Sequence, residues 1–182
     1  LHPRWSFDLL RHGKPELANF VTTDATNLEI QAAIMSRQMD ASFDWQALRW
    51  LRDLWPHTLL VKGILNAHDA ARCISEGVDG VILSNHGGRQ LDCSVSPMEA
   101  LVQSVQATGK PVLIDSGFRR GSDIVKALAL GAEAVLLGRA TLYGLAARGE
   151  AGVTEVLTLL RADIDRTLAQ IGCPSISDLS HE

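Results

Sequence analysis

Four short apolar runs, each followed by polar residues and glycine, constrain the fold of this 182-residue chain most strongly. They lie at 58–63, 80–85, 111–117 and 134–139. Each run is continuously apolar rather than alternating, which is typical of strands buried on both faces of a parallel sheet. The intervals between them fit one helix and two loops, so the pattern predicts successive βα units.

Helix signals fill the intervals between the predicted strands. They consist of N-cap residues followed by apolar positions at helical spacing, with glycine near the predicted ends. The predicted helices begin after the caps Asn66, Ser96 (followed by Pro97) and Ser122, near Asp44, and at Val153, the last running to about Ile171.

Four βα units do not close a barrel, so they form either half of an eight-unit barrel or part of a doubly wound sheet. The chain opens on Leu1 rather than on methionine, so we expect it to be the interior of a longer chain, which favours the half barrel. We therefore predict an α/β fold in which residues 44–182 form the C-terminal half, about strands 5–8, of a (β/α)₈ TIM barrel. Residues 1–43 are predicted to be an inserted loop and helix segment.

Polar side chains gather where the predicted strands end. Lys62 ends the first run, the segment 84–92 follows the second, 115–121 follows the third, and Gly138 and Arg139 follow the fourth. The carboxyl ends of barrel strands form the active-site face, so we expect these residues to share one site.

The segment 84–92, Ser-Asn-His-Gly-Gly-Arg-Gln-Leu-Asp, resembles the signature of the FMN-dependent 2-hydroxy acid oxidases and dehydrogenases. The segment 61–64, the loop 115–121 and the pair 138–139 follow the same family's order, and the resemblance covers roughly residues 44–182. It implies a flavin enzyme that oxidises an (S)-2-hydroxy acid to the 2-oxo acid.

Residue chemistry fits the roles that the resemblance implies. His86 is the expected catalytic base, because imidazole accepts a proton near neutral pH. Arg89 is expected to bind the substrate carboxylate with its planar guanidinium, beside His86. Lys62 is expected to stabilise negative charge on the reduced flavin, and Ser84 to contact the flavin. The residues alone leave open whether the α-hydrogen leaves as a proton or as a hydride.

The third and fourth strand ends are expected to hold the FMN phosphate and ribityl chain. Backbone N–H groups near Gly117 and Gly121, and the helix predicted to start at Ser122, favour an anion. The family often has glycine in place of Ser116 and proline in place of Ala140. Arg120 is either solvated or near the substrate carboxylate. The expected cofactor contacts are Asp115, Ser116, Gly117, Phe118, Arg119, Gly138 and Arg139.

Composition excludes several other classes of protein. The chain is 46% hydrophobic with a net charge of −4, which argues against nucleic acid as the main partner. No C-x-x-C pair occurs, so no metal site is expected, and the cysteines indicate a reducing compartment. No apolar run is long enough to span a bilayer.

Residues 1–20 do not follow the βα pattern. They open on an irregular-looking segment that interleaves Trp5, Phe7 and Leu10 with basic residues such as Arg4 and Arg11, a mixture suited to a membrane interface. The alternative is a surface loop that packs on a neighbouring subunit. The resemblance is to the membrane-associated branch of the family, so we expect a peripheral, monotopic protein on the cytoplasmic face of a membrane, with a cytoplasmic protein as the alternative.

The expected activity is oxidation of an (S)-2-hydroxy acid, with mandelate as the best single substrate and a quinone or other respiratory-chain component as electron acceptor. A homo-tetramer is expected from the family. The alternatives are a soluble oxidase that uses O₂, a flavin- or phosphate-binding barrel isomerase, and a half-barrel binding module. A second substrate arginine, a tyrosine and an aspartate that orients the histidine are expected in the half of the barrel that this chain lacks.

Overall fold

The computed structural model describes residues 3–13 and 28–180 of the chain. The chain divides into two compact units, Leu1–Asp44 and Trp45–Glu182. The second unit holds the βα repeats and every side chain of the predicted flavin site.

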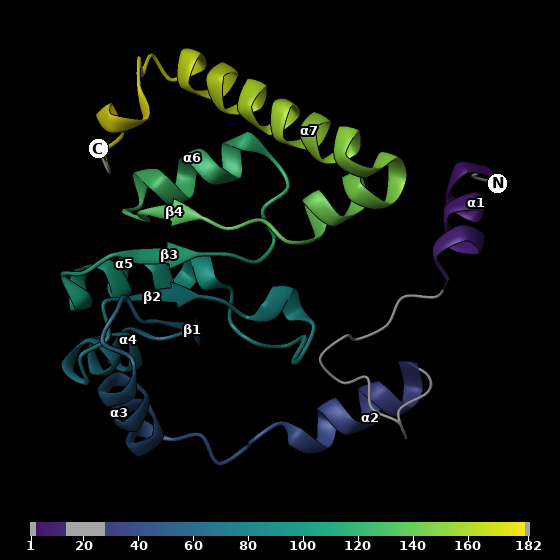
Figure 1. Ribbon diagram of the computed structural model, residues 1–182. Coiled ribbons are helices and arrows are strands. Elements are labelled where there is room, and N and C mark those ends of the chain that lie inside the picture. The colour runs from purple at the N-terminus through teal and green to yellow at the C-terminus, as the bar shows by residue number, and fades with distance from the viewer. Residues whose placement is uncertain (1–2, 14–27, 181–182) are drawn as a thin grey trace. The chain divides into compact units, whose positions relative to one another are not determined.

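The second unit is built on a parallel sheet in the order β1-β2-β3-β4, as Figure 1 shows. The strands are β1 (Leu60–Ile64), β2 (Gly80–Leu83), β3 (Val112–Ile114) and β4 (Ala134–Val135). Strand order follows chain order and every pairing is parallel, as in consecutive strands of a barrel wall. The predicted α/β fold, a partial (β/α)₈ barrel, is confirmed.

Helices follow the strands as the cap signals predicted. At the start of α4 (Ala67–Ser75), the side chain of Asn66 accepts a hydrogen bond from the Asp69 N–H at 2.8 Å, as expected of an N-cap. At the start of α5 (Pro97–Thr108), Ser96 and Pro97 occupy the predicted cap and first-turn positions. The helices of this unit are α3 (Trp45–Leu54), α4 (Ala67–Ser75), α5 (Pro97–Thr108), α6 (Gly121–Ala129) and α7 (Arg139–Gln170), with short 3₁₀ turns at His86–Gly88 and Ile176–Asp178.

Two helix starts differ from the prediction. Helix α6 begins at Gly121 rather than after Ser122, because the carboxylate of Asp123 reaches back and accepts the Arg120 N–H at 3.1 Å. Helix α7 begins at Arg139, well before the predicted start at Val153. The early part was missed because α7 bends sharply at Gly149, which has a φ of +63° and breaks the helical periodicity.

The core lies between the sheet and the helices that cover it. All four residues of β2 are buried, as expected of a central strand with both faces covered. The largest fully buried apolar side chains come from strands β2 and β3 and helices α4 and α5: Leu83, Leu101, Ile114, Val81, Val112 and Cys73. Because the strands themselves are packed with apolar side chains, the polar residues lie at their carboxyl ends.

The first unit contains α1 (Pro3–His12) and α2 (Leu28–Gln38). The expectation of an irregular opening is wrong for α1, which is helical and leaves Trp5, Phe7 and Leu10 well exposed. Residues 14–20 of the predicted membrane segment lie outside the described residues. In the part of the chain that the structure describes, no helix is both long and apolar enough to cross a membrane.

Candidate active site

Three strands bring three polar side chains together at one end of the sheet. Lys62 on β1 donates to Ser84 Oγ, just after β2, and to Asp115 Oδ2, just after β3, each at 2.5 Å. The register of β1 against β2 shifts between Lys62 and Ile64, and Gly63 at the shift has a φ of +103°. This glycine permits the irregularity that follows Lys62 in the strand.

The Lys62 contact is one of several that lower the pKa of Asp115. Burial alone would raise the pKa of this carboxyl, but hydrogen bonds from Lys62, Ser84 and Ser116 and the lysine charge outweigh burial, so the pKa lies below its ordinary value. Asp115 is therefore an anion at neutral pH, held between an ammonium group and hydroxyls.

His86 lies on a tight turn directly after β2. The side chain of Asn85 accepts the Gly88 N–H at 3.2 Å and closes the turn. His86 and Gly87 both have left-handed backbones, with φ of +57° and +68°. The conformation is rare for a non-glycine residue, so the turn itself fixes where the imidazole can reach.

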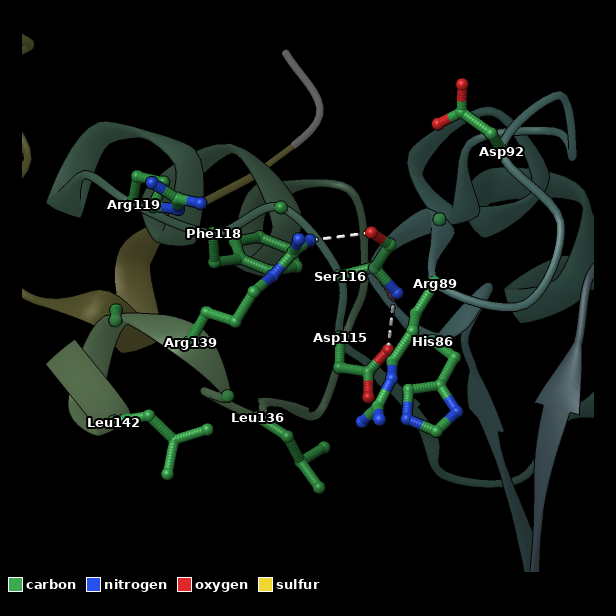
Figure 2. A pocket seen from close by; sticks show the side chains of 15 residues that line it. His86, Arg89, Asp92, Asp115, Ser116, Phe118, Arg119, Leu136, Arg139 and Leu142 are labelled. Carbon is green, nitrogen blue, oxygen red and sulfur yellow. Dashed lines mark hydrogen bonds between the residues drawn. The ribbon is translucent and has the colours of Figure 1, made fainter. Parts of the chain in front are cut away.

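A cavity of about 520 Å³ opens at these strand ends, within the range of small-ligand sites. Figure 2 shows the side chains of His86, Arg89 and Asp115 pointing into the same part of it. Its lining includes most of the predicted site: His86, Arg89, Asp115, Ser116, Gly117, Phe118, Arg119, Gly138 and Arg139. The structure thus brings the predicted base, the predicted carboxylate anchor and seven of the nine predicted cofactor contacts into one cavity.

Lys62 and Ser84 do not line this cavity. They line a neighbouring one of about 500 Å³, which also includes His86 and Gln90. Asp115 connects the two cavities, because its carboxylate lines the first and binds Lys62 at the second. Lys62 is therefore placed beside the predicted flavin site, through Asp115, rather than on its wall.

The predicted cationic residues are held by specific contacts. Arg139 donates from Nη2 to the Gly87 carbonyl at 2.6 Å, so it lies across the His86 turn (Figure 2). A Cβ on Gly87 would lie 2.5 Å from that guanidinium nitrogen, so a larger residue there would displace the end of the arginine side chain. The left-handed φ of +68° is what favours glycine at this position. Arg119 is exposed, with its guanidinium 5.6 Å from the ring centre of Tyr143.

The expectation that the amino end of α6 binds phosphate is wrong for Gly121. Its N–H donates to Asp163 Oδ2 at 2.7 Å, and the N–H groups of Arg119 and Arg120 donate to Asp123. Carboxylates of the protein thus occupy these three backbone donors at the start of α6. The groups that remain for the predicted phosphate contacts in the main cavity are the Gly117 loop, Gly138 and the side chains of Arg119 and Arg139.

Arg120 lines a different cavity, of about 420 Å³ between the loop that precedes α6 and helix α7, together with Asp163 and Arg166. Neither His86 nor Arg89 lines that cavity. The position of Arg120 in the structure favours the solvated alternative over contact with the substrate carboxylate.

The residues of the main cavity suit FMN. Gly117 and Gly138 border open space, since a Cβ added at either would meet nothing within 4 Å. Arg119 and Arg139 carry the positive charge that a phosphate needs, and Asp115 is an acceptor for ribityl hydroxyls. Phe118 contributes mainly packing, because its side chain is buried in the core. Among the described residues, no cluster of three or more His, Cys, Asp or Glu side chains forms a metal site.

Sequence reasoning missed the side chains that shape the site from a distance. Asn85 was seen only as part of the His86 motif, although an Asn three residues before Gly88 is a local turn signal. Asp163 had no signal in the sequence, because it lies 42 residues from the backbone N–H that it accepts.

Comparison with known proteins agrees with this geometry. The family model for FMN-dependent dehydrogenases matches residues 1–182. (S)-Mandelate dehydrogenase of Pseudomonas putida is 81% identical over 180 residues, and a peroxisomal (S)-2-hydroxyacid oxidase of Arabidopsis thaliana is 47% identical over 173 residues. A crystal structure of the monotopic membrane protein (S)-mandelate dehydrogenase, 81% identical, superposes with a TM-score of 0.92.

The fold and the site define the class: a (β/α)₈-type parallel sheet with its ligand cavity at the carboxyl ends of the strands. The chain belongs to the FMN-dependent dehydrogenase family. It spans about half the length of the relatives it matches, covering 46% of the Pseudomonas putida protein and 48% of the mandelate dehydrogenase of the crystal structure, against 99% and 98% of its own length.

Proposed function

We propose that this chain supplies the base, the carboxylate anchor and much of the cofactor site of an FMN-dependent (S)-2-hydroxy acid dehydrogenase. The observation that carries the proposal is the shared cavity. His86 and Arg89 line the same space as Asp115, Gly138 and Arg139, so a hydroxy acid bound by the first pair would adjoin a flavin held by the others.

Each side chain has a definite task in this reaction. Arg89 binds the substrate carboxylate with two parallel hydrogen bonds and so fixes the orientation of the α-carbon. His86 accepts the substrate proton as general base. Bound FMN supplies the acceptor for the two electrons. Lys62, paired with Asp115, holds positive charge where negative charge develops.

We propose that the cofactor is held by residues from all four strand ends. Asp115, Gly138 and Arg139 surround the ribityl chain and phosphate, with Arg119 as a second phosphate cation. Gly117 is a further proposed contact on the cavity wall. Lys62 and Ser84 are proposed to act from the neighbouring cavity, and Ser116 and Phe118 to support the site through hydrogen bonds and packing.

Mandelate is the proposed substrate, because the (S)-mandelate dehydrogenase of Pseudomonas putida is identical at 81% of the compared positions. A quinone or another component of the respiratory chain is the proposed electron acceptor, and a homo-tetramer the proposed assembly. The rival is an O₂-dependent oxidase, since a related peroxisomal protein is a 2-hydroxyacid oxidase.

The first unit is proposed to bind the cytoplasmic face of a membrane. Helix α1 exposes Trp5, Phe7 and Leu10 and ends in Arg11 and His12, which suits an interface of apolar chains and anionic headgroups. The related (S)-mandelate dehydrogenase of known structure is described as monotopic. Replacing residues 1–27 by a short polar linker should move the protein from the membrane fraction to the supernatant, and unchanged sedimentation would contradict membrane binding.

The activity is tested by adding (S)-mandelate, without oxygen, to the FMN-loaded enzyme. The flavin's visible absorbance should bleach with the (S) enantiomer and persist with the (R) enantiomer. Reoxidation by a quinone analogue but only slowly by O₂ supports the dehydrogenase, whereas rapid peroxide formation supports the oxidase. A flavin that no 2-hydroxy acid bleaches would reject both and favour a barrel isomerase or a binding module.

A further inference from the structure

The hydroxyl of Ser116 connects the end of β3 to the turn that carries His86. Ser116 Oγ accepts the N–H groups of Asn85 at 3.3 Å and Gly87 at 3.0 Å, and it donates to Asp115 Oδ1 at 2.7 Å. A serine hydroxyl has one proton and two lone pairs, and these three contacts use all of them.

A second serine completes the attachment of the turn. Ser84 Oγ accepts the His86 N–H at 3.1 Å and the Lys62 ammonium at 2.5 Å. Three consecutive backbone N–H groups, at residues 85–87, are therefore bound by two serine hydroxyls. Both serines are in turn bonded to one partner of the Lys62–Asp115 ion pair. The two serines thus connect the turn that carries the proposed base, His86, to the Lys62–Asp115 ion pair beside the proposed flavin site.

The backbone of Ser116 shows that this link has a conformational cost. Its φ is +77°, a left-handed value that glycine adopts freely and serine rarely. Glycine, which the family resemblance places here, would relieve the strain but would leave the amides of Asn85 and Gly87 without this acceptor. Strained backbones of this kind persist where surrounding contacts over-determine them.

We propose that Ser116 is a positioning residue that fixes the His86 turn against the Asp115 end of β3. This inference rests on the proposed function, because positioning matters only where His86 acts on substrate. Ser116 acts on the reaction through the turn and not by touching the transferred proton.

The test uses two substitutions in the FMN-loaded enzyme, Ser116→Gly and Ser116→Ala. Both remove the hydroxyl, but glycine relieves the left-handed strain and alanine keeps it. Two measurements are made on each: anaerobic flavin reduction by saturating (S)-mandelate, and amide hydrogen exchange of the peptide covering residues 84–90. Ser75→Ala is the matched control, because Ser75 is exposed and its hydroxyl bonds only the Arg72 carbonyl among the contacts described for it.

Both variants should retain FMN, exchange amides faster across residues 84–90, and reduce the flavin about tenfold more slowly. The limiting rate of flavin reduction should fall, whereas the (S)-mandelate concentration that gives half of the limiting rate should change less. Faster exchange with an unchanged rate would overturn the proposal, because Ser116 would then be structural only. A slow alanine variant beside a normal glycine variant would also overturn it, since strain and not the hydroxyl would be the cause.

Failure of the proposed function gives a different pattern. In that case the unsubstituted enzyme itself would show no flavin reduction by the hydroxy acid, while hydrogen exchange would still report on the turn. Unchanged exchange at residues 84–90 in both variants would reject the role of Ser116 whatever the reaction.

Discussion

Lys62 Nζ lies 2.5 Å from Asp115 Oδ2, although the two residues are 53 positions apart in the chain. The contact spans from β1 to β3 across the end of β2, where Ser84 shares the same ammonium group. The contact therefore joins the ends of β1 and β3 beside the candidate site. Loss of the ion pair should affect both the charge of the site and the stability of the sheet.

Replacing Lys62 by methionine should lower the free energy of unfolding by about 1 kcal/mol, because Asp115 loses its cationic partner while the lysine is itself half exposed. Urea denaturation measures this change. Arg148→Met is the matched control, because the Arg148–Glu155 pair is exposed on both sides and its loss should cost less than about 0.5 kcal/mol. Equal effects of the two substitutions would contradict a special role for the Lys62 pair.

The Lys62–Asp115 pair also predicts a pH dependence. The pKa of Asp115 is lower in the folded state than its ordinary value of 3.8, so the unfolded state binds the proton more tightly. The stabilisation is complete well above that value and is lost as the pH falls through it toward the folded pKa. Asp115→Asn removes this titration, so the stability difference between the two proteins should shrink between about pH 5 and pH 3. A difference that stays constant over this range would contradict the prediction.

Local signals were enough to predict most of the fold. Asn66 and the Asp69 N–H that it caps are three residues apart, so the start of α4 can be read directly from the sequence. Continuous apolar runs likewise predicted the four strands. Local signals did not predict the bend of α7 at Gly149. The two parts of the helix pack against each other at Gly144 and Gly152, and this contact forms only once the chain has folded.

Gly121→Ala should destabilise the protein by roughly 2 kcal/mol or more, as overpacking does. An added Cβ would lie 2.3 Å from the backbone nitrogen of Ile164 and 2.6 Å from the carbonyl carbon of Asp163, neither of which can move independently of α7. Ser122→Ala is the matched control and should change stability by less than about 0.5 kcal/mol, because Ser122 does not cap α6. If Ser122→Ala lowered stability more than Gly121→Ala, Ser122 would be the helix cap as the sequence predicted. The close contact of Gly121 with α7 would then be contradicted.

The residues of the candidate site could be predicted from the sequence, but the hydrogen bonds between them could not. Because the carboxyl ends of parallel strands meet at one edge, Lys62, His86 and Asp115 were expected at the same end of the sheet. Sequence spacing does not reveal hydrogen-bond partners, however, and so the attachment of the His86 turn to Ser116 was not predicted. The same limit explains why Gly121 was assigned to phosphate rather than to Asp163.

The most direct test of the proposed chemistry is the rate of flavin reduction after His86 is replaced in the FMN-loaded enzyme. His86→Asn is preferred beside His86→Ala, because asparagine adopts the left-handed φ of +57° more readily and so preserves the turn. Both variants should bind FMN as the unsubstituted enzyme does, while anaerobic reduction by (S)-mandelate slows by about 100-fold or more. Reduction at the unsubstituted rate in variants that retain FMN would contradict the assignment of His86 as the base.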